Sequence, residues 1–156
     1  MRSTLVLLAL VAALSAAPAA PAPSGAFTLR GTVTYVVDGD TLDVRLTGGG
    51  RERVRLIGID TPERGECHAA NATAAARSLA YGRSVVLKGD ATQDTRDRYG
   101  RLLAYVYVRD VFVNVEMVRR GFASVATFPP NVRHVGELLR AQREARAAGR
   151  GLWGAC

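Results

Sequence analysis

The sequence predicts a mainly β fold of the α+β class, a five-stranded barrel with three helices. The first observation is that five segments carry strand patterns, at residues 27–37, 42–46, 54–59, 85–88 and 102–108. The second is an alanine-rich helical segment between the third and fourth strands, and the third is that helical segments follow the fifth strand. Five strands with a helix after the third is the layout of the oligonucleotide-binding (OB) barrel.

The first three strands are expected to form a meander. In segment 27–37, apolar residues alternate along one face, which is a strand signal: Phe27, Leu29, Val33, Tyr35 and Val37. The same alternation continues through 42–46, the glycines of 48–50 form a turn, and 54–59 returns as the third strand.

The second half of the chain alternates helices and strands. A helix over 69–81 ends at Gly82, and a polar loop over 89–100 separates the last two strands. After the fifth strand, Asn114 is expected to cap a short helix that stops at Gly121. A last helix is expected over about 132–148.

The N-terminal segment has the pattern of a secretory signal peptide. A positive start at Arg2 precedes an apolar run over 5–14, and small residues and prolines follow. The run is too short to cross a bilayer, which takes about 20 apolar residues. We therefore expect a signal peptide over 1–19, cut at about 17–20, a tether over 20–26 and one domain over 27–156. The protein would be secreted, with no membrane span after cleavage.

The charge balance suggests a polyanionic partner. The chain has 21 basic and 14 acidic residues, and loss of Arg2 with the leader leaves 20 − 14 = +6. A strongly basic exported domain is typical of proteins that bind nucleic acid. Solubility alone is the other explanation of this charge.

Two cysteines, Cys67 and Cys156, are expected to form a disulfide, because an even number in an exported chain favours pairing. The chain-entropy model gives at most about 4–5 kcal/mol for a loop of this length. Two unpaired thiols are the alternative.

Two acidic motifs lie at the ends of the predicted hairpin between the second and third strands. Asp38-Gly39-Asp40-Thr41 precedes it, and Asp60-Thr61-Pro62-Glu63 follows it. Antiparallel pairing about Gly49 places residue 40 opposite roughly residue 58, so Asp40 and Asp60 should meet at its open end. Two adjacent carboxylates repel unless a cation joins them, and oxygen ligands suit calcium or magnesium. Taken alone, each motif is more typical of an ordinary turn or loop than of a metal site.

Two arginines stand near these motifs. Arg55 lies on the third strand, and Arg101 stands at the start of the fifth. Two guanidinium groups directed at one phosphate would stabilise the charge that grows in a displacement reaction. A straight strand would separate Arg55 from Asp60 by about 17 Å. A bend, which Gly58 permits, is therefore required to bring them together. Surface charges or ion pairs are the alternative for each arginine.

Together, these stretches resemble the staphylococcal nuclease (thermonuclease) family. The matching segments span residues 33 to 153 and read VVDGDTLDV, VRLIGIDTPE, DRYGRLLAYVY, VNVEMVRRGFASV and a closing helix that ends in GLW. The motifs agree with the family in order, spacing and structural context.

The resemblance implies an OB-type barrel with three helices and a calcium ion. The ion would be held by the carboxylates of Asp40 and Asp60 and by the main-chain oxygen of Thr61. Glu63 would activate the attacking water as general base.

The resemblance also assigns the two arginines to the scissile phosphate. Arg55 and Arg101 would bind it and stabilise the five-coordinate transition state, and cleavage of DNA or RNA would leave 3′-phosphate ends. We expect a monomer with no stable protein partner. The alternative function is an OB-fold module that binds nucleic acid without cutting it. The enzyme is favoured because the whole catalytic set implied by the resemblance is present.

The nucleotide pocket departs from the family pattern. Tyr99 matches a tyrosine near the nucleotide, and we expect it to bind substrate together with its neighbour Arg98. Where the type member has two further pocket tyrosines, this chain reads Thr127-Phe128-Pro129. Phe128 could stack on a base, but we favour core packing for it.

Overall fold

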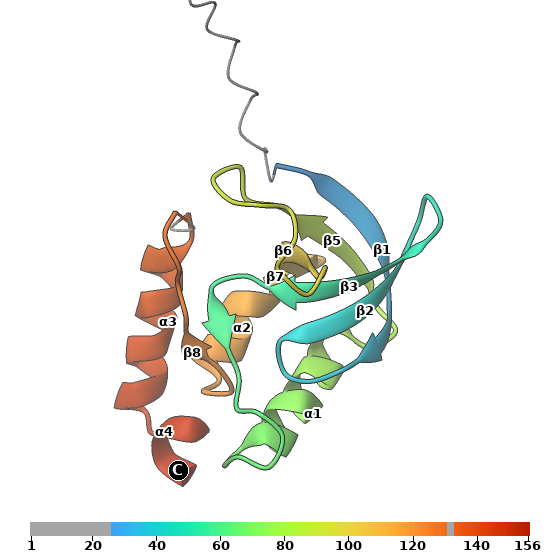
Figure 1. Cartoon of the computed structure of the whole chain (residues 1–156). Coiled ribbons are helices and arrows are strands. Elements are labelled where there is room, and N and C mark those ends of the chain that lie inside the picture. Colours follow the sequence, from blue (N-terminus) through green and yellow to red (C-terminus); the bar gives the residue numbers. More distant parts are fainter. Residues whose placement is uncertain (1–25, 131–132) are drawn as a thin grey trace, which may run out of the picture.

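A computed structural model describes residues 26–130 and 133–156 of the chain. The predicted signal peptide, nearly all of the tether and the predicted start of the last helix lie outside these residues. Five main strands form a barrel (Figure 1): β1 (Thr28–Val36), β2 (Thr41–Leu46), β3 (Arg51–Leu56), β5 (Ser84–Lys88) and β6 (Leu102–Val108). Their order is β3-β2-β1-β5-β6, and a parallel pairing between β3 and β6 closes the barrel. The predicted five-stranded barrel is thus confirmed.

Helices cover one end and one side of the barrel (Figure 1). In the described part of the chain they are α1 (Ala69–Ala80), α2 (Val113–Arg119), α3 (Val135–Ala147) and the single turn α4 (Leu152–Ala155). The first three are the predicted helices, and α2 packs between α1 and α3. No helix of the described residues combines the length and the apolar composition needed to cross a membrane.

The barrel interior is filled by the inward-facing residues of alternating strand positions. Val44, Val54, Leu87 and Val106 are fully buried there, and Met117 of α2 joins the same apolar cluster. Complete burial of such a side chain is worth roughly 1.5–3 kcal/mol. This packed core supplies a rigid wall for the groups at the end of β3.

The first strand departs from the predicted alternation. The register of β1 against β2 shifts between Val33 and Tyr35, which marks a β-bulge. Val36 is therefore buried, whereas the Tyr35 side chain is 54% exposed. The prediction that Tyr35 shares a face with Val33 was wrong, because one extra residue in the strand turns all later side chains to the opposite face.

The third strand ends earlier than predicted. Thr41 pairs with Arg55, and the Leu56 amide donates to the Asp40 carbonyl at 2.9 Å, so residue 40 lies opposite 56 rather than 58. The hairpin is centred one residue earlier than Gly49. After Leu56 the chain turns, and the two-residue strand β4 (Ile59–Asp60) leaves the barrel to pair with β8 (Ser124–Val125).

Asn114 does not cap a helix. Helix α2 begins at Val113, and the Asn114 side chain is fully buried. Its Oδ1 accepts from the Val106 amide at 3.0 Å, and its Nδ2 donates to the Ile57 carbonyl at 2.8 Å. The side chain thereby fastens α2 to β6 and to the turn that follows β3.

The predicted disulfide is confirmed. Cys67 and Cys156 are joined, with 6.0 Å between their Cα atoms. The bond ties the segment between Thr61 and α1 to the residue that follows α4. It therefore anchors the segment that carries Glu63.

Candidate active site

Arg55 is the centre of the candidate site. Its Nε lies 3.2 Å from Oδ1 of Asp40, and its NH2 group lies 3.0 Å from Oδ1 of Asp60. The two carboxylates that the hairpin argument placed together therefore converge on one guanidinium. The Arg55 side chain is only 18% exposed, whereas that of Asp60 is 56% exposed.

The bend required to bring Arg55 and Asp60 together occurs at Gly58. This residue has φ +80°, and a Cβ there would lie 2.7 Å from a methyl group of Leu138. The NH1 group of Arg55 donates to the carbonyls of Leu56 and Ile59, at 2.7 and 2.8 Å. The chain therefore wraps around the guanidinium, and the bend suggested by Gly58 is confirmed.

Asp40 is a buried carboxylate that several donors surround. Its Oδ2 accepts from the amide and the hydroxyl of Thr61, both at 3.0 Å, and its Oδ1 accepts from the Thr41 hydroxyl at 3.1 Å. Burial, with a smaller contribution from the charge of Asp38, raises the pKa of Asp40 despite the opposing effects of Arg55 and Thr61. Further positive charge beside Asp40 would therefore stabilise its ionised form.

Arg101 approaches the same place from the other side of the barrel seam. The parallel pairing sets Val54 beside Leu102 and Arg55 beside Leu103, so Arg101 precedes β6 at about the level of Arg53 in β3. Its Nε donates to Oδ2 of Asp97 at 2.7 Å, and its NH1 lies 3.5 Å from the Thr41 hydroxyl. Thr41 thus contacts both Asp40 and Arg101 and links the two arginines.

A cavity of about 300 Å³ joins the two arginines to aromatic side chains. Arg55, Arg101, Tyr99 and Phe128 all line it. Tyr99 is 73% and Phe128 77% exposed, so the prediction that Phe128 packs in the core was wrong. The guanidinium carbons of Arg98 and Arg101 lie 5.5 and 5.4 Å from the Tyr99 ring centroid. The cavity therefore combines cations with two exposed aromatic faces.

Gln93 is a cavity residue that sequence reasoning missed. It lines the same cavity, and its Nε2 is buried without a hydrogen-bond partner in the described part of the chain. A buried donor without a partner costs about 1–3 kcal/mol, so an acceptor on a ligand would relieve that cost. A glutamine in a polar loop carries no signal in the sequence that would single it out.

Glu63 is not brought to the two arginines. It is exposed, and within residues 26–130 and 133–156 its carboxylate forms no hydrogen bond or ion pair. Its backbone amide donates to Oε2 of Glu66 at 2.7 Å, as part of the turn that leads to α1. Together with Asp38 it lines a separate hollow of about 500 Å³.

The oxygen atoms near Arg55 that could ligate a metal fit a hard cation only in part. No group of three or more His, Cys, Asp and Glu side chains in the described residues is placed to hold a metal ion. Asp40 and Asp60 offer carboxylate oxygens, and Thr61 adjoins Asp40 through its backbone. Such an oxygen-only set suits calcium or magnesium, and calcium takes about 6–8 ligands. Water and substrate oxygens would therefore have to complete the shell.

This geometry can hold an anion between two fixed guanidinium groups, beside an acidic oxygen set and next to rings on which a base can stack. A phosphodiester with its attached nucleotide has this combination of charge and shape.

Comparison with known proteins gives consistent matches. Residues 53–155 match the family model described as staphylococcal nuclease homologue. A thermonuclease of Staphylococcus intermedius is 35% identical over 130 residues, which cover 78% of this chain and 74% of that protein. An uncharacterised endonuclease of Escherichia coli O157:H7 is 40% identical over 126 residues, 80% of this chain and 77% of that protein. An uncharacterised protein of Bacillus anthracis is 35% identical over 136 residues, 83% of this chain but only 63% of its own length.

Proposed function

The chain belongs to the staphylococcal nuclease family, and we propose that it is a calcium-dependent endonuclease that hydrolyses the phosphodiester bonds of DNA and RNA. The observation that carries the proposal is the convergence of Arg55 and Arg101 on one cavity beside Asp40 and Asp60. The names of the thermonuclease and endonuclease relatives agree with it.

The two arginines would bind the scissile phosphate. The guanidinium of Arg55 is held by carbonyls and carboxylates, and that of Arg101 is held by Asp97, so neither needs to reorganise when charge develops. Donors fixed in advance stabilise a transition state more than the ground state. Both arginines would therefore lower the barrier as negative charge grows on the phosphate oxygens.

Asp40, Asp60 and the main-chain oxygen of Thr61 would hold the calcium ion. A bound calcium ion would supply Lewis-acid activation of the phosphate and would orient it. The raised pKa of Asp40 supports a cation here, because positive charge offsets the cost of burying an ionised carboxylate.

Glu63 is proposed as the general base that takes a proton from the attacking water. Its exposed carboxylate stands two residues beyond Thr61 on the loop that the disulfide anchors. Catalytic contacts are often long without substrate and shorten in the complex, so its distance from the arginines is compatible with this role.

Tyr99, Arg98 and Phe128 would bind the nucleotide next to the scissile bond. Tyr99 and Phe128 present exposed rings at the cavity, and bases stack on such rings with little sequence preference. Gln93 would donate its unpartnered N–H to an acceptor on the base edge.

We further propose that the protein is secreted through the signal peptide over 1–19, acts as a monomer and leaves 3′-phosphate ends. The Cys67–Cys156 bond supports secretion, because disulfides persist in oxidising compartments. A barrel that binds nucleic acid without cutting it is the alternative, and the exposed position of Glu63 away from the arginines is the observation that favours it.

One assay distinguishes the two functions. The purified protein is incubated with single-stranded DNA or RNA in calcium, in magnesium or in a chelator, and product ends are identified. We expect cutting in calcium, its loss in the chelator, and 3′-phosphate ends. Asp60→Asn should abolish calcium-dependent cutting, whereas Asp94→Asn, an exposed acid on the 89–100 loop, should retain it. A folded protein that binds the strand but does not cut it in calcium would reject the enzyme.

A further inference from the structure

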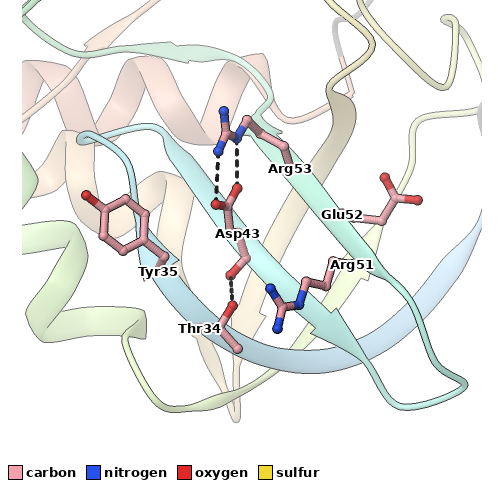
Figure 2. Close-up of a pocket in the computed structure, with 6 residues that line it drawn as sticks. All are labelled: Thr34, Tyr35, Asp43, Arg51, Glu52 and Arg53. Carbon is pink, nitrogen blue, oxygen red and sulfur yellow. Dashed lines mark hydrogen bonds and ion pairs between the residues drawn. The ribbon is translucent and has the colours of Figure 1, made fainter.

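The outer side of β1, β2 and β3 carries a basic and aromatic surface beyond the cavity. Strand alternation turns Val44 and Val54 into the core, so their strand neighbours Asp43, Arg45 and Arg53 point outward. We call this surface the outer strand face, and it consists of Tyr35, Asp43, Arg45, Arg51 and Arg53. Most of its members line a hollow of about 540 Å³ (Figure 2).

The strand register places an exposed tyrosine next to this row of charges. Tyr35 of β1 pairs with Asp43 of β2, which pairs with Arg53 of β3. The bulge after Val33 is what turns Tyr35 outward. Figure 2 shows the Tyr35 ring on one side of Asp43 and Arg51 on the other. The ring face is available for stacking, because the side chain is 54% exposed.

The outer strand face has an excess of positive charge. Arg53 binds Asp43 through two bonds, Nε to Oδ1 at 2.8 Å and NH2 to Oδ2 at 3.0 Å. Arg45 of β2 and Arg51 of β3 lie opposite one another in the strand register. Neither forms an ion pair with any described residue. Glu52 also lines the hollow, but it is paired with Arg96 at 2.8 Å. Apart from that pair, three arginines and one aspartate leave 3 − 1 = +2 on this face. An anionic partner would neutralise that charge.

The outer strand face continues directly from the candidate active site. Arg51, Arg53 and Arg55 are alternate residues of β3, so they follow one another at steps of about 7 Å on the same side of the strand. A nucleic-acid strand that places one phosphate at Arg55 can therefore run along β3 without leaving a positively charged surface.

We propose that single-stranded nucleic acid extends from the cut phosphodiester onto the outer strand face. One base stacks on the Tyr35 ring, and backbone phosphates contact Arg51 and Arg45. The partner is a single strand because stacking on an exposed ring requires a base that is not already stacked in a duplex. The inference rests on the proposed function only for the position of the scissile phosphate at Arg55.

Binding is measured apart from cutting, by fluorescence anisotropy of a labelled single strand of about 12 nucleotides in a chelator. Tyr35→Ala is expected to raise the Kd about 5-fold or more, because a stacked base contributes about 1–3 kcal/mol. Tyr81→Ala is the matched control, since Tyr81 is 48% exposed but follows α1, against Arg77. It should leave the Kd unchanged.

The phosphate contacts are tested by salt dependence. Arg51→Ala should reduce the slope of log Kd against log salt by about 0.7 for one lost contact to a single strand. Arg140→Ala, which removes an exposed arginine from α3, is the control of equal charge and should leave the slope closer to that of the unaltered protein.

Each outcome bears on one proposal or on both. If the unaltered protein cuts the strand but Tyr35→Ala and Arg51→Ala bind like their controls, the extended surface is wrong and the nuclease assignment stands. If the protein binds but never cuts, the nuclease assignment is wrong, and the anisotropy still decides the surface. A protein that neither binds nor cuts the strand refutes both.

Discussion

Two arginine–aspartate pairs flank the candidate active site, and the carboxylates in them are affected in opposite ways. Burial raises the pKa of Asp40, and the attraction of Arg55 does not offset it. Burial acts in the same direction on Asp97, but donors from Arg101 and from the backbone outweigh it and lower the pKa. The contact distances agree, at 3.2 Å for Arg55–Asp40 and 2.7 Å for Arg101–Asp97.

At Asp97 the hydrogen-bond donors outweigh the effect of burial on the pKa, and we call this pair complete. At Asp40 they do not, and we call that pair incomplete. Asp97 is satisfied by Arg101 and by the amides of Tyr99 and Arg101, so its pair is a support that orients one guanidinium. Asp40 is surrounded by donors, yet its pKa remains raised, so its ionised form would gain from additional positive charge. A cation held by Asp40 and Asp60 would supply that charge, in agreement with the metal site proposed on the Arg55 side of the cavity.

Arg55→Ala is expected to have the largest effect, since it removes a phosphate ligand and leaves Asp40 buried without its charge partner. The rate of cutting should fall by about 10²–10³, and the free energy of unfolding should fall by about 3 kcal/mol. Rates and urea unfolding measure these two effects. Arg53→Ala on the same strand is the stability control, because its exposed pair with Asp43 should contribute only about 0–1 kcal/mol. Unchanged unfolding in Arg55→Ala would contradict the incomplete-pair interpretation.

Arg101→Ala should lower the rate to a similar extent but should hardly affect stability. Asp97 would keep its two backbone donors and is not left unpaired, so a loss of only about 1 kcal/mol is expected. Circular dichroism and urea unfolding of this variant, compared with Arg55→Ala, test whether the two pairs differ. Equal destabilisation by the two substitutions would remove the distinction between them, and normal cutting would show that Arg101 does not bind the phosphate.

Asp97→Asn should give the smallest effect, a pH-dependent loss of stability of about 1 kcal/mol at neutral pH. The folded-state pKa of Asp97 is lowered, so its contribution is present above the unfolded value, about 3.9, and is lost as the pH falls through the lower folded value. The difference between the variant and the unaltered protein should therefore disappear in acid. Asp94→Asn on the same loop serves as the control. A difference that persists at low pH would show that charge is not its cause.

Much of the candidate site was predictable because its residues stand at strand ends and bends, which the sequence marks with turn residues. The two Asp-containing motifs end the hairpin strands, and Gly58 marks the bend that brings Asp60 back to Arg55. Phe128, Gln93 and Tyr35 were predicted wrongly or missed. Exposure of Phe128 and the unpartnered amide of Gln93 depend on how distant segments pack around one cavity. The position of Tyr35 depends on a bulge that its own strand pattern does not show.

The order of strands and helices, the pairing of the two cysteines and the family can be predicted from the chain alone, because alternation, capping glycines and motif spacing are local properties. The register of β2 against β3, the contacts of Arg55 and the link that Asn114 makes between α2 and the barrel become visible only in the folded molecule. These features depend on which residues far apart in the chain share a closed barrel. Closure is set by the simultaneous packing of all its strands, which no single segment encodes.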